Sequence, residues 1–317
     1  MPPRVRPAMD SKDFRLLAEL NEDARQSLHA LGRRVALSAP AVRERLRRLE
    51  VGGILQGYWV SIDPAVFGRK DVLVSFDGEW TRSDAVRVLD APDVAWVAWK
   101  VDGSLTVQAW PHEVKREVET LARFLGREPT WHGVSRSGWT GTLSGLDWRV
   151  IDALIDNPLS PIEGLAVATG LSPKTVRRHL EGLTRGEAIF VVARLGFLND
   201  AGGLVYHLVV SGAAPFPELR RTLGEAVLIH ETAEPRRQYI FCRADSLGEL
   251  TAKTHALGKL SGVSSVQVTL NREFLVGTKF QHRLVQERIE ASERVRRRKG
   301  LGATRATRAV RGLDAGK

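Results

Sequence analysis

The chain has 317 residues, of which 43% are hydrophobic and 26% are charged, and its formal net charge is +10. This composition is typical of a folded protein with two ordinary domains or several small ones, and it excludes collagen-like and disordered chains. One cysteine, Cys242, excludes an intrachain disulfide and a cysteine-based metal cluster, and no apolar run approaches the roughly 20 residues of a membrane span. We therefore expect a cytoplasmic protein without a metal, a cofactor or a membrane partner.

The two ends of the chain differ from its body in composition. Residues 1–9 contain two arginines and three prolines, and we expect them to form a flexible arm. Residues 283–317 contain 11 basic and 4 acidic side chains, with four consecutive basic residues at 296–299. The glycines, alanines and threonines that follow favour solvated chain and contact with phosphates, although a solvated helix end has a similar composition. We expect this segment to be a basic tail.

Residues 10–64 are predicted to form a winged helix-turn-helix. Apolar residues recur at helical spacing in three stretches, at 14–20, 28–35 and 42–49. Ser38 is placed to cap the third helix, which makes the preceding turn resemble helix-turn-helix punctuation. After Gly52-Gly53 the pattern becomes that of a strand, which ends at Asp63-Pro64 and predicts a wing and a linker.

Residues 65–140 alternate between strand and helix patterns. Strands are predicted at 72–76, 94–99, 105–110 and 131–134, and helices at 83–89 and 113–125. The order βαββαβ predicts a ferredoxin-like sheet that two helices cover on one face.

The second half of the chain repeats this series at an offset of 134 residues. Residues 13–52 align without a gap on residues 147–186. A second winged helix-turn-helix is predicted at 144–196 and a second sheet domain at 197–282, with strands at 204–210, 227–231, 238–242 and 263–270 and helices at 217–223 and 247–260. The chain is therefore interpreted as a tandem duplication of the α+β class.

The third helix of the first unit has the features of a DNA recognition helix. Val42, Leu46 and Leu49 face the other two helices, which leaves a cationic outer face. Arginine pairs bidentately with guanine or with phosphate oxygens, and a helix N-terminus itself favours an anion. The DNA-binding residues predicted in this unit are Ser38, Pro40, Arg43, Arg45, Arg47 and Arg48. An exposed arginine-rich face without function is the alternative, but it does not explain the capped turn.

The matching helix of the second unit is less basic, because residues 159–182 have a net charge of only +1. Either it reads a second half-site or it is a retained three-helix scaffold, and we favour the first interpretation. The predicted DNA-binding residues are then Ser172, Lys174, Thr175, Arg177 and Arg178. Because the two helices differ in sequence, the predicted operator is asymmetric.

Several of these motifs occur together in one known family. Leu37-Ser38, residues 42–50, residues 53–58 and Ile62-Asp63-Pro64 ending at Gly68 resemble the amino-terminal half of Lrp/AsnC (feast/famine) regulators. With the βαββαβ module that follows, called the RAM domain in that family, one unit resembles one whole regulator subunit. The chain thus resembles a covalent pseudo-dimer.

The resemblance implies partners for the chain. It implies that the winged helix-turn-helix binds double-stranded operator DNA, that RAM domains pair through their sheets, and that an amino acid or another small effector binds between protomers. A homo-oligomer, such as a dimer of tandem chains, is expected. The family's Gly-x-x-Asp element is altered, since Thr106 rather than aspartate stands three positions after Gly103, and Arg237 and Ile240 occupy the matching positions of the second unit. Asp102 is the obvious nearby carboxylate, and no effector residue is assigned.

No catalytic signature occurs in the chain, so no catalytic residue is predicted and the protein is expected not to be an enzyme. The alternative is a siroheme decarboxylase, an enzyme class that resembles this regulator family and also occurs as fused pairs. His230, Arg236, Arg237 and Tyr239 surround a predicted hairpin and would hold an anionic tetrapyrrole in such an enzyme. They equally fit a solvent-exposed hairpin tip. The tryptophans Trp96, Trp99, Trp110 and Trp131 are interpreted as sheet core or partner interface.

Overall fold

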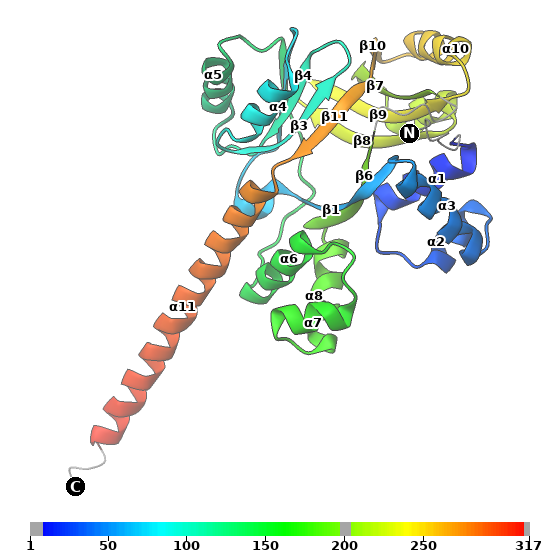
Figure 1. Cartoon of the computed structure of the whole chain (residues 1–317). Coiled ribbons are helices and arrows are strands. Elements are labelled where there is room, and N and C mark those ends of the chain that lie inside the picture. The colour runs from blue at the N-terminus through cyan, green and yellow to red at the C-terminus, as the bar shows by residue number, and fades with distance from the viewer. Residues whose placement is uncertain (1–8, 197–203, 314–317) are drawn as a thin grey trace.

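The computed structural model describes residues 9–196 and 204–313, with side chains described as far as Arg297 (Figure 1). The helices α1 (Ser11–Glu22), α2 (Leu28–Val35) and α3 (Ala39–Val51) are followed by strand β1 (Leu55–Ile62) and the short 3-10 helix η1 (Pro64–Phe67). The order recurs as α6 (Gly145–Asp156), α7 (Ile162–Thr169), α8 (Pro173–Arg185) and β6 (Ile189–Leu195). Each three-helix unit packs around apolar stripes at the predicted spacing, so both helical units are confirmed.

Two antiparallel sheets follow the two helical units. The first contains β2 (Val72–Phe76), β3 (Val94–Lys100), β4 (Leu105–Ala109) and β5 (Trp131–Val134), covered by α4 (Arg82–Leu89) and α5 (Val114–Leu125). The second contains β7 (Leu204–Gly212), β8 (Ala226–Ala233), β9 (Arg236–Ala244) and β10 (Val263–Thr269), covered by α9 (Phe216–Leu223) and α10 (Leu247–Gly258). Their shared strand order, β3-β4-β2-β5 in one and β8-β9-β7-β10 in the other, confirms the predicted α+β fold class.

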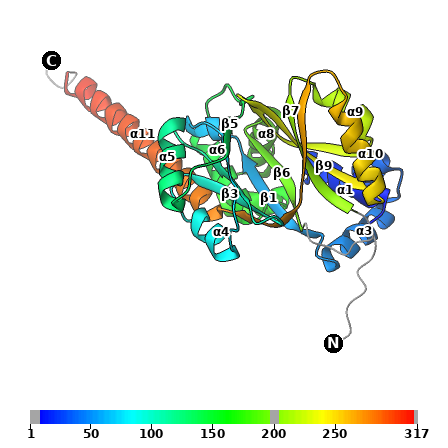
Figure 2. The ribbon, with the colours of Figure 1, turned by 90° about the horizontal axis from the view of Figure 1, so that it is seen from above.

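The two sheets face each other, and their covering helices lie on the outer flanks (Figure 2). A separate apolar core fills the space between each sheet and its helices. The two sheets also meet at one edge, through a bridge between Val134 and Glu234 and contacts between β5 and β8. The inner faces of the sheets are therefore the ones that enclose a shared space.

Strand β1 pairs with β6 of the other unit rather than folding back as a wing on its own helices. In this antiparallel ribbon Tyr58 lies opposite Ala193, and Trp59 lies opposite Val192. At the offset of 134, Tyr58 corresponds to Val192 and Trp59 corresponds to Ala193. The register is therefore symmetric about a local two-fold axis, as at an isologous interface. The strand predicted after Gly53 is present, but its partner differs from the predicted wing because the longer-range pairing satisfies its backbone groups.

Because β1 and β6 cross at the ribbon, each helical unit packs on the sheet of the opposite half of the chain. Phe14 of α1 stacks on Phe241 of β9 with ring centroids 5.2 Å apart. In turn Phe67, which follows β1, lies 5.2 Å from Trp148 of α6 and stacks on Trp110 at 6.0 Å. These aromatic contacts join the two halves into one continuous core.

Met9 does not belong to a flexible arm. It is 1% exposed and packs in the core, and its carbonyl oxygen accepts a hydrogen bond from Nε of Arg243 at 3.3 Å. The arm predicted at residues 1–9 is therefore wrong at its last residue, because burial of the thioether against the second half outweighs chain freedom. Residues 1–8 lie outside the described part of the chain.

The C-terminal region also differs from its prediction. Strand β11 (Asn271–Val276) leaves the second half and pairs with β3, so that it extends the first sheet. Helix α11 (Thr278–Leu313) then begins inside the predicted sheet domain and packs on α6 through Leu284 and Val285. The predicted boundary between a sheet domain at 197–282 and a tail at 283–317 thus falls within one helix. Apolar residues on one side of its first turns explain why this part is anchored rather than solvated chain.

None of the helices in the described ranges combines the length and the apolar character that crossing a bilayer requires.

One buried acid in the first sheet domain predicts a pH dependence of stability. Glu117 of α5 is 6% exposed, and burial raises its pKa to about 7, with Asp93 adding to the shift and Arg69 and Arg116 opposing it. A raised folded-state pKa means that the native state retains a proton that the unfolded chain loses, so stability falls as the pH rises from about 4.5 to 7. We expect Glu117→Gln to raise the free energy of unfolding at pH 8 by up to about 3 kcal/mol and to leave it unchanged at pH 4. Urea unfolding at the two pH values measures this, and equal stability of both proteins at pH 8 would contradict it.

Candidate nucleic-acid interface

Helix α3 is seated by an apolar stripe and opened by a serine cap. The hydroxyl of Ser38 accepts a hydrogen bond from the backbone N–H of Ala41 at 3.3 Å, which satisfies one of the free N–H groups of the first turn. Val42, Leu46 and Leu49 are buried against the other two helices. The opposite face of α3 is consequently fixed in orientation and points away from the core.

Part of the predicted basic face of α3 is exposed. Pro40, Arg43, Glu44 and Arg47 are all exposed. Arg47 donates to Glu44 at 2.7 Å, an ion pair on the helix surface whose hydrogen bond lowers the pKa of Glu44. Among the described residues, no carboxylate lies within 4.0 Å of Arg43. Arg43 therefore presents a guanidinium group without a carboxylate partner, among the described residues, on this surface.

Arg45 and Arg48 lie elsewhere than the sequence predicts. The Nη1 group of Arg45 donates to Asp10 at 2.7 Å and to Asp13 at 2.8 Å, and Nη2 of Arg48 lies 3.5 Å from Asp13. The Asp13 side chain is only 3% exposed, so this network holds α3 against α1 from within the unit. The geometry favours a structural role over base contact for Arg45.

Helix α8 repeats this construction in the second unit. Ser172 accepts from the backbone N–H of Thr175 at 3.1 Å and lies 2.9 Å from its hydroxyl, so Ser172 and Thr175 serve the cap. Lys174, Arg177 and Arg178 are exposed on the outer face. Among the residues that the structure covers, none of these three has a carboxylate within 4.0 Å.

A contact between the recognition helix and the aspartate that caps the first helix occurs in both units with different side chains. His179, 134 residues after Arg45, places Nδ1 2.6 Å from a carboxylate oxygen of Asp147, which is the counterpart of Asp13. Both aspartates also close a capping box at the start of α1 or α6. The two aspartates occupy matching positions in the sequence repeat, but only the fold shows which side chains they contact.

The two recognition helices lie on the same side of the paired sheets (Figure 1). Their units also touch directly, because Arg25 donates to the carbonyl oxygens of Pro158 at 2.6 Å and Ser160 at 2.8 Å. This contact and the β1–β6 ribbon fix the two units relative to each other. Both cationic faces are therefore carried by one rigid frame.

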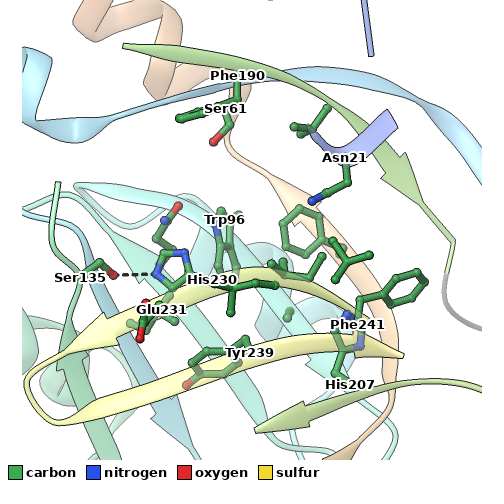
Figure 3. Close-up of a pocket in the computed structure, with 18 of the residues that line it drawn as sticks. Asn21, Ser61, Trp96, Ser135, Phe190, His207, His230, Glu231, Tyr239 and Phe241 are labelled. Carbon is green, nitrogen blue, oxygen red and sulfur yellow. Dashed lines mark hydrogen bonds between the residues drawn. The ribbon is translucent and has the colours of Figure 1, made fainter. Parts of the chain in front are cut away.

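A cavity of ≈ 840 Å³ lies between the inner faces of the sheets and the β1–β6 ribbon, an arrangement that sequence reasoning did not anticipate (Figure 3). Trp96, His230 and Tyr239 line it, with Asn21 of α1 at its margin. His230 and Tyr239 thus do not sit on an exposed hairpin tip, because the hairpin of β8 and β9 turns its inner face toward the first sheet. Burial raises the pKa of Tyr239 to about 12.

His230 also links the two sheets across the cavity. Its Nε2 atom lies 2.7 Å from the Ser135 hydroxyl and 3.3 Å from a carboxylate oxygen of Asp71, both on the first half (Figure 3). Burial raises the pKa of Asp71, with His230 opposing the shift. The Ser135 hydroxyl and the Asp71 carboxylate both approach the same imidazole nitrogen. This arrangement joins the two sheets; it does not place the imidazole between the acid and the hydroxyl. Arg236 pairs with Glu231 at 2.6 Å, and Arg237 stacks over Trp131 at 4.0 Å.

The remaining candidates have structural surroundings. Trp110 is 1% exposed in the aromatic core, and Trp99 donates from its indole N–H to the carbonyl oxygen of Trp80 at 2.8 Å. Asp102 accepts from the N–H of Ser104 at 2.9 Å and so serves the turn between β3 and β4. Within the described ranges, no group of three or more metal-ligating side chains converges.

Comparison with known proteins indicates the sequence family of the chain. Residues 9–50 match the AsnC-type helix-turn-helix domain. The chain is 31% identical over 150 residues to HTH-type transcriptional regulator Rv2324 of Mycobacterium tuberculosis, covering 44% of this chain and 94% of that protein. It is 33% identical over 104 residues to the leucine-responsive regulatory protein of Rhizobium meliloti, covering 31% of this chain and 67% of that protein.

A solved structure is similar over most of the chain. The siroheme decarboxylase NirDL aligns with 89% of this chain and all of its own, with 14% sequence identity and a TM-score of 0.48. The family assignment rests on the sequence relatives, since one regulator is matched over nearly its whole length. The chain belongs to the Lrp/AsnC family of HTH-type transcriptional regulators.

Proposed function

We propose that this regulator binds duplex DNA by inserting the outer face of α3 into the major groove. The observation that carries the proposal is Arg43: it is exposed, it lacks a carboxylate partner among the described residues, and it projects from a helix seated by a buried stripe. An uncompensated guanidinium group gains more from an anion or a guanine edge than one already paired. Arg43 is therefore assigned to the nucleic acid.

The other predicted residues take different parts in this proposal. Arg47 leaves its ion pair with Glu44 and contacts a phosphate of the duplex instead. Ser38 and Pro40 place the start of α3 near the backbone of the duplex. Arg48 stands at the edge of the contact. Arg45 instead positions α3 through Asp10 and Asp13.

The second recognition helix is proposed to read a second half-site. Its support is the exposed set of Lys174, Arg177 and Arg178, and the location of α8 on the same side of the sheets as α3 (Figure 1). Two-fold sites place recognition helices about 34–36 Å apart, one turn of the duplex, which two units in one frame supply. Since α8 presents different side chains, the proposed operator has unequal halves.

We also propose that two chains associate and that a small effector acts on the sheet domains. β10 is an edge strand of the second sheet. Val268 of this strand is 36% exposed, and Leu270, which directly follows the strand, is 40% exposed. An unpaired edge with exposed apolar side chains favours pairing with another chain.

Charge reversal at Arg43 tests the principal proposal. We expect Arg43→Glu to weaken binding of selected genomic DNA fragments at least tenfold, because a favourable contact with a phosphate or base becomes a repulsion. Gel shifts at several salt concentrations measure the affinity and the number of phosphate contacts. Lys115→Glu is the matched control, since Lys115 is exposed on α5 with no carboxylate within 4.0 Å among the described residues. Equal loss in both variants, or none in Arg43→Glu, would refute the role of α3.

The same change on α8 tests the second half-site. We expect Arg177→Glu to weaken DNA binding less than Arg43→Glu does, because α8 carries the less basic surface. Competition gel shifts with duplexes mutated in one half at a time should show that each variant loses discrimination in one half only. If Arg177→Glu binds every duplex as the parent does, α8 is a scaffold.

A siroheme decarboxylase is the second candidate function, and the placement of His230 and Tyr239 in the cavity favours it specifically. In that function the imidazole would transfer a proton beside the bound tetrapyrrole. Titration with siroheme should then produce a shifted visible absorption band that His230→Ala abolishes. A spectrum equal to the sum of the separate components argues for the regulator alone.

A further inference from the structure

Strands β3 and β4 of the first sheet pack one apolar face against the covering helices and carry polar side chains on the face toward the cavity. On β3, Val97 and Trp99 pack toward α4 and α5, while Trp96 and Lys100 point into the inter-sheet cavity. On β4, Thr106 faces the cavity and is only 3% exposed. Sheet faces that bury against each other are normally apolar, so a buried polar face around an open volume is typical of a ligand site.

The acidic side chains around this cavity already have partners. Asp71 lies 3.3 Å from His230, Glu231 lies 2.6 Å from Arg236, and both Glu19 and Glu22 pair with Arg34. The remaining acid, Asp63, accepts from the Ser137 hydroxyl at 2.6 Å and from the N–H of Ala65 at 2.9 Å. These carboxylates are therefore committed to the protein itself.

The cationic side chains around the cavity are mostly uncommitted. Within the described ranges, no carboxylate lies within 4.0 Å of Lys70, Lys100, Arg136, Arg194 or Arg220, all of which line the cavity. Lys100 is the deepest of them, and burial lowers its pKa, with Asp102 and Asp77 opposing the shift. Lys100 is half-buried, and the removal of its ammonium group from water is only partly offset by Asp102 and Asp77, so an anionic ligand beside it would reduce the remaining cost.

Aromatic rings supply the apolar part of the wall. Trp96 and Phe274 have ring centroids 5.0 Å apart, and Trp59 lies 6.0 Å from Phe274. Phe241 of the second sheet also lines the cavity (Figure 3). Such rings favour offset or edge-to-face contacts with a flat ligand. The volume of ≈ 840 Å³ falls in the range of sites for drug-sized molecules, roughly 300–1,000 Å³.

From the uncompensated cations and the aromatic wall, we infer that the cavity binds an organic anion with an aromatic body. The ligand's acidic group pairs with Lys100, its flat body packs against Trp96 and Phe274, and Arg220 approaches from the exposed rim. This inference rests on the proposed action of a small effector on the sheet domains and names the chemical class of that effector; it does not require that the protein bind DNA.

Fluorescence titration of the full chain tests it with two probes that share one body. The anionic probe is 1-anilinonaphthalene-8-sulfonate, and the neutral probe is N-phenyl-1-naphthylamine. We expect saturable binding of the sulfonate at one site per chain, and an affinity about tenfold lower in Lys100→Met, because one charge-assisted contact is lost. The neutral probe should bind parent and variant equally, and Lys115→Met on the outer helix should match the parent with both probes.

Arg220→Gln provides a second variant, because Arg220 lies on the surface of α9 and its replacement leaves the core intact. We expect it to weaken binding of the sulfonate and not of the neutral probe, and it decides the matter if Lys100→Met fails to fold. Sulfonate affinity equal to that of the parent in every folded cavity variant overturns the inference. So does an equal loss for both probes. Because no nucleic acid is present, failure here is distinct from failure of the proposed DNA contact.

Discussion

The antiparallel pairing of β1 with β6 is the constraint on which the rest of the structure depends. Among the described residues each of the two strands pairs only with the other, so neither half of the chain is complete alone. Their crossing sends α1 onto the second sheet, where Phe14 meets Phe241, and brings α6 to the first sheet beside Phe67. β11 and α11 add a second tie between the same halves. The two recognition helices are held in one frame for this reason.

The frame has consequences for how a ligand and DNA would act on each other. The ribbon and α1 form part of the cavity wall, through Ser61, Phe190 and Asn21 (Figure 3). The same elements carry the first helical unit and join it to the second. A ligand that favours one spacing of the sheets would therefore favour one placement of the recognition helices, which is the physical form that coupling between two sites takes. The two halves are not equivalent, since Arg45 is matched by His179 and, within the described ranges, a fifth strand extends the first sheet and not the second.

Local features of the fold could be predicted from the sequence, and long-range ones could not. Helical stripes such as Val42, Leu46 and Leu49 depend on a period of a few residues, and Ser38 caps the helix that directly follows it. The stripe and the cap could therefore both be predicted from the sequence. The crossing of β1 depends on partners that lie 127 to 140 residues away, and β11 has no counterpart among the described residues of the first half. Arg45 resembled its neighbours in sequence, but its position beside the buried stripe directs it to Asp13. The cavity could not be predicted because its lining residues come from strands of both halves, which only the crossed fold brings together.

A hydroxyl-radical footprint of the full chain on its selected DNA tests the central claim most directly, because it reports where two helices held in one frame meet the duplex. With one chain bound per duplex, the account predicts two protected segments on one face, about one helical turn apart, with unequal protection. A single protected segment, or two segments on opposite faces of the duplex, would contradict the claim that the crossed frame presents both recognition helices together.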